Sequence, residues 1–327
     1  MDHTPPSQTA IRVRGLRRTF RTRRAEVEAG AGIDLDVRRA EVFGFLGPNG
    51  AGKTTTLRML ATLLPPTAGE ATVAGCDLRR QPQRVRERIG YVGQAGGLDH
   101  GVSGRAELVF QGRLYGLSSR AARARAGELL AAFELEGVAD RTAQTYSGGQ
   151  RRRLDIALGL VHRPELLFLD EPTTGLDPQS RARMWDEVRR LRDGGTTVFL
   201  TTHYLEEADA LCDRLAIIDH GRIVSEGTPD ELKRAVAGDV ITLGVQGDPA
   251  VALSLLSSRA FLRDHDPVAP DSQSLRVYVD RGETAMPAIF RVLDQAGVVL
   301  ETVSMSRPSL DDVFLRQTGR RLREEAA

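Results

Sequence analysis

The sequence predicts an α/β fold with a largely parallel sheet, and three observations support this prediction. Apolar runs of strand length alternate with helical stretches over roughly the first 235 residues, an order typical of such sheets. Two of these runs, 42–46 and 166–169, carry no polar side chain, which indicates strands buried on both faces. A glycine-rich loop follows the first run and two carboxylates follow the second, as expected where strands end at a ligand-binding edge.

The glycine-rich loop has the pattern of a phosphate-binding loop: Gly, four residues, then Gly-Lys-Thr. It lies between the strand 42–46 and a helical stretch, 55–60, and a chance turn would not explain Lys53 together with both flanks. Backbone N–H groups and a helix N-terminus bind phosphate, Lys53 would reach the β- and γ-phosphates, and the Thr54 hydroxyl would contact magnesium. The residues expected to bind a nucleotide are Gly47, Pro48, Asn49, Gly50, Ala51, Gly52, Lys53, Thr54 and Thr55.

Composition excludes several other classes of protein. The 327 residues have room for one large domain and a small one, and 41% hydrophobic with 27% charged residues is ordinary for a globular protein. A formal net charge of +1 gives no reason to expect a nucleic-acid partner. No apolar stretch approaches the roughly 20 residues of a membrane helix, and the polar start is not a signal peptide. Cys76 and Cys212 have no metal-ligand spacing, so we expect reduced thiols in a cytoplasmic protein.

The other elements of the large domain are predicted from local patterning, in chain order. Strands are expected at 11–13, 33–37, 71–73, 89–92, 166–170 and 196–201, with a closing hairpin of 215–218 and 222–225. A basic loop, 17–24, is expected to carry Phe20 between the first two strands. Helices are expected at 84–88, 104–137 with a break near Gly116, 150–161, 179–192 and 205–213.

The composition shifts after about residue 236, and the remainder predicts a second, smaller domain. Its expected order is strand 240–245, helix 249–258, strand 260–264, strand 274–280, helix 284–296 and strand 298–304. This β-α-β-β-α-β order is typical of a ferredoxin-like unit, and a short amphipathic helix, 308–320, follows it. The predicted domains are therefore 1–235 and 236–327.

Two adjacent carboxylates, Asp170 and Glu171, end the strand 166–170. Neighbouring strand residues point to opposite sides, so we expect different roles for them. Asp170 can hold magnesium next to Thr54, and Glu171 can polarise an attacking water as a general base. The alternative is that these residues only end a strand. It is less favoured here because the phosphate-binding loop precedes them in the same chain.

A third motif, Tyr146-Ser147-Gly148-Gly149-Gln150, precedes an arginine-rich helix. Ser147 is a good N-cap, and simple capping would by itself be the better explanation. In a chain with a phosphate-binding loop, however, this motif closely resembles the signature of the ATP-binding cassette (ABC) family, usually Leu-Ser-Gly-Gly-Gln, with Tyr146 in place of leucine. The resemblance covers residues 11–235 and implies a cassette with a RecA-like mixed sheet, an antiparallel β subdomain and a helical signature subdomain.

The resemblance also implies roles for further residues. Phe20 would stack on adenine, Gln94 would contact magnesium and the attacking water, and His203 would contact the γ-phosphate and pair with Glu171. The catalytic set is then Glu171, His203 and Gln94, and the magnesium set is Thr54, Gln94 and Asp170. Two chains would pack head to tail as a homodimer, with ATP between one phosphate-binding loop and the partner's Ser147, Gly148, Gly149, Gln150 and Asp177.

Three fragments are similar to the daunorubicin-resistance group of ABC export ATPases: 41–46, 151–155 and 308–320. Gln150 and Ala40 depart from that group, where methionine and glycine are common at these positions. The resemblance implies an ATPase on the cytoplasmic face of the membrane that powers export of a drug, antibiotic or lipid through a separate permease. Residues 95–117 would receive that permease.

Two alternatives stay open at this point. One is a soluble ABC ATPase acting on ribosomes or DNA, although such proteins usually carry two cassettes or a long coiled coil. The other concerns residues 240–320, which could sense a ligand or simply add dimer contacts. The substrate and the permease are not defined by this sequence, because the cargo pathway would lie in the permease chain.

Overall fold

The computed structural model describes residues 8–21, 26–235, 238–266, 268 and 273–319. The chain forms two compact units, of which the first reaches Pro229 and the second begins at Asp230. Helix α8 (Pro229–Ala235) lies within the predicted first domain, 1–235, whereas the contacts of residues 230–235 group them with the second unit. No helix of the described segments is long and apolar enough to span a membrane.

A six-stranded sheet forms the centre of the first unit, in the order β10-β9-β3-β8-β7-β6. Its strands are β3 (Val42–Leu46), β6 (Ile89–Val92), β7 (Leu166–Asp170), β8 (Thr197–Thr202), β9 (Arg214–Asp219) and β10 (Arg222–Gly227). All neighbours are parallel except β10, which pairs antiparallel with β9. Every residue of β3, β7 and β8 is buried, as the apolar runs predict.

Three helices pack close to the central strands. Helix α1 (Lys53–Leu60) lies against β7 and β8, and α6 (Pro178–Asp193) and α7 (Leu205–Leu211) lie against β3 and β8. Phe199 of β8 contacts the rings of Phe43, Phe45 and Phe168 from the neighbouring strands, with ring centroids 5.6–5.7 Å apart. This aromatic cluster fixes the strands whose carboxyl ends carry the candidate site.

A second, antiparallel sheet has the order β2-β1-β4-β5 and shares one hydrophobic core with the first. Its strands are β1 (Thr9–Arg21), β2 (Glu26–Arg38), β4 (Ala68–Val73) and β5 (Cys76–Asp77). The expected loop at 17–24 is wrong for 17–21, because these residues continue β1 and pair with β2 as far as Arg21 opposite Glu26. Residues 22–24 lie outside the described residues.

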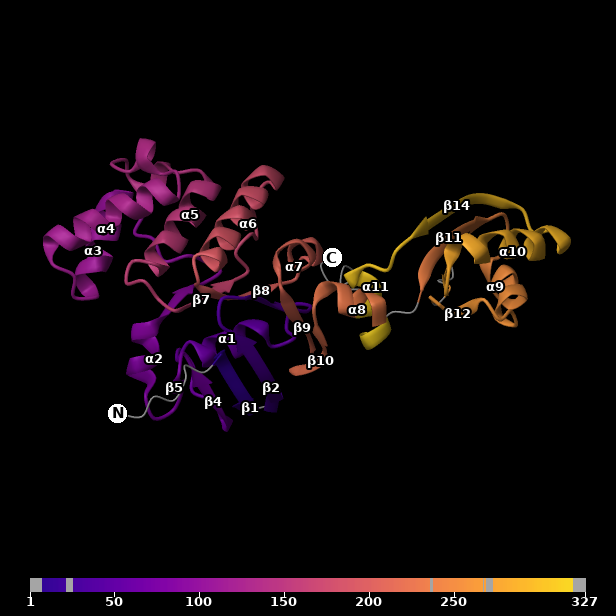
Figure 1. Ribbon diagram of the computed structural model, residues 1–327, viewed down its shortest axis with the longest axis horizontal. Coiled ribbons are helices and arrows are strands. Elements are labelled where there is room, and N and C mark those ends of the chain that lie inside the picture. The colour runs from indigo at the N-terminus through magenta and orange to yellow at the C-terminus, as the bar shows by residue number, and fades with distance from the viewer. Residues whose placement is uncertain (1–7, 22–25, 236–237, 267, 269–272, 320–327) are drawn as a thin grey trace. The chain divides into compact units, whose positions relative to one another are not determined.

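The helical part of the first unit contains α3 (Gly104–Leu114), α4 (Ser119–Ala132), η1 (Glu136–Val138), η2 (Ala143–Thr145) and α5 (Gly148–Gly159), whereas α2 (Pro82–Arg88) lies against β5 and β6. In Figure 1, α3, α4 and α5 gather on the opposite side of β7 from the strands of the antiparallel sheet. The predicted helical region 104–137 is divided as expected near Gly116, whose φ is 82°. Ser118 then caps α4 by accepting a hydrogen bond from Ala121 N.

The second unit contains β11 (Asp239–Val245), α9 (Pro249–Ser257), β12 (Leu262–His265), β13 (Ser274–Val279), α10 (Gly282–Gln295), β14 (Leu300–Ser306) and α11 (Leu310–Thr318). The sheet order is β12-β13-β11-β14 and all neighbours are antiparallel, which is the ferredoxin-like arrangement that the element order predicts. Apolar residues of α9 and α10 cover one face of this sheet.

Candidate active site

The phosphate-binding loop connects β3 to α1, and its backbone is too closely packed to carry side chains at two glycines. A Cβ atom at Gly52 would lie 2.1 Å from the Ala29 carbonyl oxygen, and the φ of Gly52 is 102°. A Cβ atom at Gly47 would lie 2.3 Å from the Ile218 carbonyl oxygen. Gly52 is also the N-cap of α1 and provides no side-chain cap, so the first turn presents its N–H groups to an anion.

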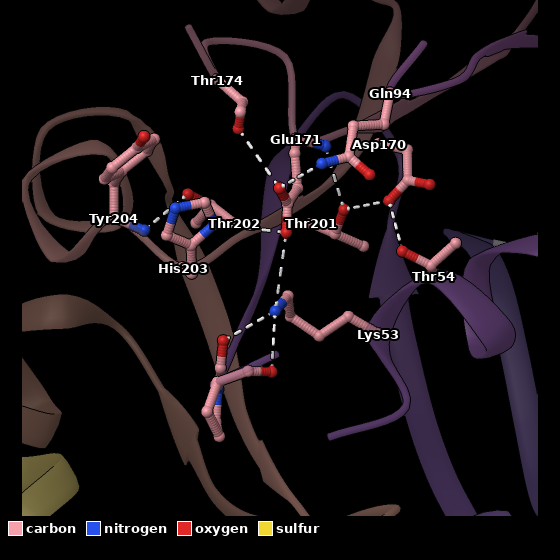
Figure 2. A network of polar contacts seen from close by, with 12 residues as sticks. Lys53, Thr54, Gln94, Asp170, Glu171, Thr174, Thr201, Thr202, His203 and Tyr204 are labelled. Carbon is pink, nitrogen blue, oxygen red and sulfur yellow. Dashed lines mark hydrogen bonds and ion pairs between the residues drawn. The ribbon is translucent and has the colours of Figure 1, made fainter. Parts of the chain in front are cut away.

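Lys53 begins α1 and points back into the loop. Its side chain is 4% exposed, and Nζ donates hydrogen bonds to the Gly47 and Pro48 carbonyl oxygens at 2.7 and 3.0 Å. Nζ also lies 3.7 Å from Glu171 Oε1, and Figure 2 shows these contacts. Burial lowers the pKa of Lys53, while the charges of Glu171 and Asp170 act in the opposite direction.

Asp170 and Thr54 form the part of the site that fits a divalent cation. Asp170 Oδ1 accepts hydrogen bonds from Thr54 Oγ1 at 2.9 Å and from Thr201 Oγ1 at 2.6 Å (Figure 2). Asp170 Oδ2 is buried and has no hydrogen-bond partner. A buried carboxylate oxygen without a partner, next to a hydroxyl, is the donor chemistry that Mg²⁺ prefers.

Glu171 follows Asp170 but leaves the strand with a φ of 46°, which is unusual for a residue other than glycine. Its Oε2 accepts hydrogen bonds from Gln94 Nε2 at 3.0 Å and Thr174 Oγ1 at 3.2 Å. Its Oε1 lies 3.2 Å from His203 Nδ1. Burial alone would raise the pKa of Glu171, but the adjacent His203 ring and the charge of Lys53 outweigh it, so the pKa lies below its ordinary value.

The structure therefore gathers six of the predicted site residues at the carboxyl ends of β3, β6, β7 and β8: Lys53, Thr54, Gln94, Asp170, Glu171 and His203. An ionised carboxylate held among an amide, a hydroxyl and an imidazole can accept a proton from a water molecule. A lysine and helix N-terminus beside it can stabilise phosphate charge. The arrangement suits hydrolysis of a nucleoside triphosphate.

The signature residues 147–150 lie at the start of α5, and Gly148 lines a hollow that Gln94 also lines. Ser147 caps α5 in a reciprocal capping box with Gln150, through bonds of 3.2 and 2.9 Å. Within the described segments, no hydrogen bond or ion pair joins 147–150 to Lys53 or Glu171. Asp177 caps α6 by accepting a bond from Ser180 N at 2.9 Å. The predicted contacts of 147–150 and Asp177 with nucleotide stay predictions.

Phe20 lies near the end of β1 and is 37% exposed. The Arg18 guanidinium lies 4.8 Å from the centre of its ring. An exposed ring can receive a planar base, so the predicted stacking on adenine remains open to test.

Two hydroxyls at the site were not predicted from the sequence. Thr201 lies opposite Asp170 in the parallel register of β7 and β8 and donates to its carboxylate. Thr174 donates to Glu171 from the following loop. Only the sheet register identifies Thr201, whereas Thr174 lies three residues after Glu171, a spacing that could have suggested a local contact.

The fold and this site define an ATPase of the ATP-binding cassette class. A family model for "ABC transporter" matches residues 31–174, and one for "ATP-binding protein DrrA1-3-like, C-terminal domain" matches residues 227–318. The chain is 47% identical to the daunorubicin resistance ATP-binding protein DrrA3 of Streptomyces coeruleorubidus, over 98% of this chain and 100% of that protein. The chain belongs to the DrrA group of ABC transporter ATP-binding proteins.

Other relatives agree with this assignment. The daunorubicin/doxorubicin resistance ATP-binding protein DrrA of Streptomyces peucetius is 47% identical over 99% of this chain and 98% of that protein. The solved structure of cbiO1 from Clostridium perfringens, part of the ABC transporter complex cbiONQ, has a TM-score of 0.64 at 25% identity and covers 77% of this chain and 96% of its own.

The ATP-binding cassette MJ0796, solved as a dimer bound to ADP and Pi, shares the fold. Its TM-score is 0.62 at 24% identity, over 67% of this chain and 98% of its own. The predicted cassette fold is thus confirmed. The family model and the relatives show that the protein is an ATPase that uses ATP and Mg²⁺. Magnesium bound by the Thr54–Asp170 pair would neutralise phosphate charge.

Proposed function

We propose that this ATPase is the energy-supplying subunit of an exporter and works as a homodimer on the cytoplasmic face of a membrane. One observation carries the proposal: the chain presents a complete phosphate-binding and carboxylate site and, apart from it, a second capped helix N-terminus at 147–150. Two such surfaces on one chain complement each other when a second copy is turned head to tail. The helix N-terminus of one copy would then complete the phosphate site of the other.

The residue roles follow from this arrangement. Glu171 acts as general base toward water. Gln94 and His203 orient the Glu171 carboxylate, because each of them contacts one of its two oxygens. Lys53 and the loop 47–55 bind the phosphates, and Thr54, Asp170 and Gln94 hold magnesium. Ser147, Gly148, Gly149, Gln150 and Asp177 bind the nucleotide of the partner copy, and Phe20 stacks on its own adenine.

The surface for the permease is a groove of about 370 Å³ between the central sheet and the helical part. From the predicted contact region 95–117, Gly96, Gly97, Glu107, Gln111 and Tyr115 line it. Phe110 and Leu114 on α3 expose more than half of their side chains. Burial and the charge of Asp99 raise the pKa of Glu107. The lining carries both acidic and basic side chains, Glu107 and Asp155 with Arg86 and His162, and such a groove beside exposed apolar residues suits a short amphipathic permease helix.

The cargo is proposed from the relatives alone. The names of similar proteins concern daunorubicin, doxorubicin or linearmycin resistance and Nod factor export. The names therefore concern either resistance to a drug or export of a molecule. We infer that this chain powers export of a hydrophobic drug-like or lipid-like compound through a separate permease.

Purification of the tagged full chain from native membranes tests this function. We expect an integral membrane protein to co-purify and to raise ATP hydrolysis, and Glu171→Gln to abolish the stimulated activity because the base is lost. Glu107→Lys should remove the stimulation while basal hydrolysis stays, because it places a positive charge in the groove. Glu136→Lys, at an exposed position of η1 outside the groove, is the matched control. Recovery of ribosomes or nucleic acid in place of a membrane protein would contradict the transport assignment.

A further inference from the structure

Arg152 on α5 is a buried arginine whose guanidinium is held by carbonyl oxygens. Its side chain is 8% exposed, and within the described residues no carboxylate lies within ion-pair distance of it. Nη1 donates to the Gly93 carbonyl at 2.7 Å, and Nε donates to the Pro172 carbonyl at 2.8 Å. Nη2 donates to the carbonyls of Asp170 and Glu171 at 3.0 and 3.3 Å. The Arg152 side chain therefore joins α5 to two catalytic loops, the one after β6 that carries Gln94 and the one after β7 that carries Glu171.

The turn that Arg152 holds is the one that aims the catalytic carboxylate. Glu171 has a φ of 46°, a conformation that a residue with a side chain keeps only when its surroundings enforce it. Arg152 contacts the carbonyl before, at and after this residue. The Glu171 N–H is fixed from the other side by the Thr201 carbonyl at 3.1 Å. Arg152 thus holds three successive carbonyls of the turn that directs Glu171 toward Gln94 and His203.

Asp155 lies one helical turn further along α5 and holds the other end of the Gln94 loop. Asp155 Oδ1 accepts a hydrogen bond from Gly97 N at 2.9 Å. A Cβ atom at Gly96 would lie 2.6 Å from Asp155 Oδ2, and the φ of Gly96 is 73°, so the loop approaches this carboxylate closely. Arg152 at one end and Asp155 at the other therefore bracket residues 93–97, which carry Gln94.

We propose that Arg152 and Asp155 are positioning residues that join the permease groove to the catalytic carboxylate. Arg152 fixes the turn that presents Glu171, and Asp155 fixes the loop that presents Gln94. Gly93, Gly96, Gly97 and Asp155 also line the groove, so displacement of the loop there reaches Glu171 through α5. The part that concerns the groove rests on the proposed function, whereas the effect of Arg152 on Glu171 requires no permease.

The chemistry of the contact favours arginine over other residues. A guanidinium offers five N–H donors in a plane, and the four hydrogen bonds of Arg152 reach four different carbonyl oxygens. A lysine has a single nitrogen and cannot span them. The next residue, Arg153, provides a matched control, because its Nη1 donates to the Phe133 carbonyl in the helical part and does not contact the catalytic loops.

A double-mutant cycle on the full chain tests the proposal. In steady-state assays, Arg152→Gln should lower kcat at least about tenfold with KM for ATP changed less than about twofold. In single-turnover assays of the Glu171→Gln protein, the same substitution should lower the residual rate by less than about threefold, because the base that it positions is already absent. Arg153→Gln should have the same small effect in both backgrounds.

Equal losses from Arg152→Gln in the two backgrounds would overturn the proposal, because a merely structural residue acts independently of Glu171. If Arg152→Gln does not fold, Arg152→Lys is carried through the same cycle, with the same criterion for rejection.

Asp155→Asn keeps an acceptor for Gly97 N and should retain activity, whereas Asp155→Ala should speed hydrogen exchange of the Gly97 amide and lower kcat. Unchanged exchange and kcat in Asp155→Ala would overturn its role. If the chain recruits no permease but the double-mutant cycle gives the expected result, the proposed function fails while the positioning role of Arg152 stands.

Discussion

At the residue scale, Glu207 is a buried acid behind the catalytic loops, and its surroundings favour the neutral form. Its side chain on α7 is inaccessible and accepts a hydrogen bond from Trp185 Nε1 at 3.2 Å. Burial raises the pKa of Glu207, and the bond from Trp185 offsets only part of this effect, since Oε2 has no hydrogen-bond partner. An unfolded glutamate titrates near 4.5. The stability that this proton contributes is therefore present below that pH and is lost as pH rises through the raised pKa.

Glu207→Gln should stabilise the protein more at pH 8 than at pH 5. The amide keeps an oxygen for Trp185 and cannot ionise, so the cost of ionising a buried acid at high pH is removed. We expect a melting temperature about 2–4 °C above that of the parent protein at pH 8 and a smaller difference at pH 5, measured by differential scanning fluorimetry. Glu206→Gln, at the exposed neighbouring position, should show no such pH dependence. Equal shifts of Glu207→Gln at both pH values would contradict the prediction.

At the element scale, the start of α5 is held by Tyr146, the residue that replaces leucine in the common signature. Tyr146 is 3% exposed and its hydroxyl donates to the Val138 carbonyl of η1 at 2.7 Å. The same hydroxyl lies against Gly104 at the start of α3, where a Cβ atom would be 2.5 Å away. The signature helix, η1 and α3 are therefore packed together around one phenol, and Gly104 provides the space for it.

Gly104→Ala should destabilise the protein by about 1–3 kcal/mol, because the added methyl group overlaps the tyrosine hydroxyl. Urea unfolding measures this change. Tyr146→Phe removes the hydroxyl, so the double variant should be less destabilised than the sum of the two single variants. Gly127→Ala on α4, where a Cβ atom meets nothing within 4 Å, should stabilise by roughly 0.5–1 kcal/mol. If Gly104→Ala behaves like Gly127→Ala, the predicted overlap is wrong.

At the scale of the whole molecule, the first unit carries two features that suit an anion, the phosphate-binding loop and the capped start of α5. A single chain has no described polar contact between 147–150 and Glu171, although both features suit phosphate chemistry. A second copy can supply the missing half of each site, and two sites per dimer follow from the two-fold symmetry. ATP binding and dimer formation are then one linked equilibrium.

Glu171→Gln should accumulate as a dimer when ATP and magnesium are present, because the nucleotide is bound but hydrolysis is slowed by about 10²-fold or more. Light scattering after size-exclusion chromatography measures the mass. Lys53→Ala in the same background should remain monomeric under identical conditions, since it removes the charge that faces the phosphates. A monomeric Glu171→Gln protein that has ATP bound would contradict the homodimer.

Much of the fold was predictable because its signals are local. The bounds of β6 and of β7 were predicted residue for residue, because each strand is a short, largely apolar run flanked by charged residues or a glycine. The predicted loop at 17–21 was wrong because ladder pairing with the long partner strand β2 extends β1 through a basic segment. Thr201 and Arg152 were missed because their partners are contributed by other strands and loops.

The sequence by itself determined the elements, the cassette class and the identity of the chemical groups, because strand burial, glycine spacing and carboxylate position are properties of short segments. The pairing of Glu171 with His203 was expected from the family resemblance. The tertiary structure alone decided that Asp170 meets Thr201, that Glu171 meets Gln94, and that Arg152 meets the turn that carries Glu171. These contacts depend on strand order and register, which are set by packing between segments far apart in the chain.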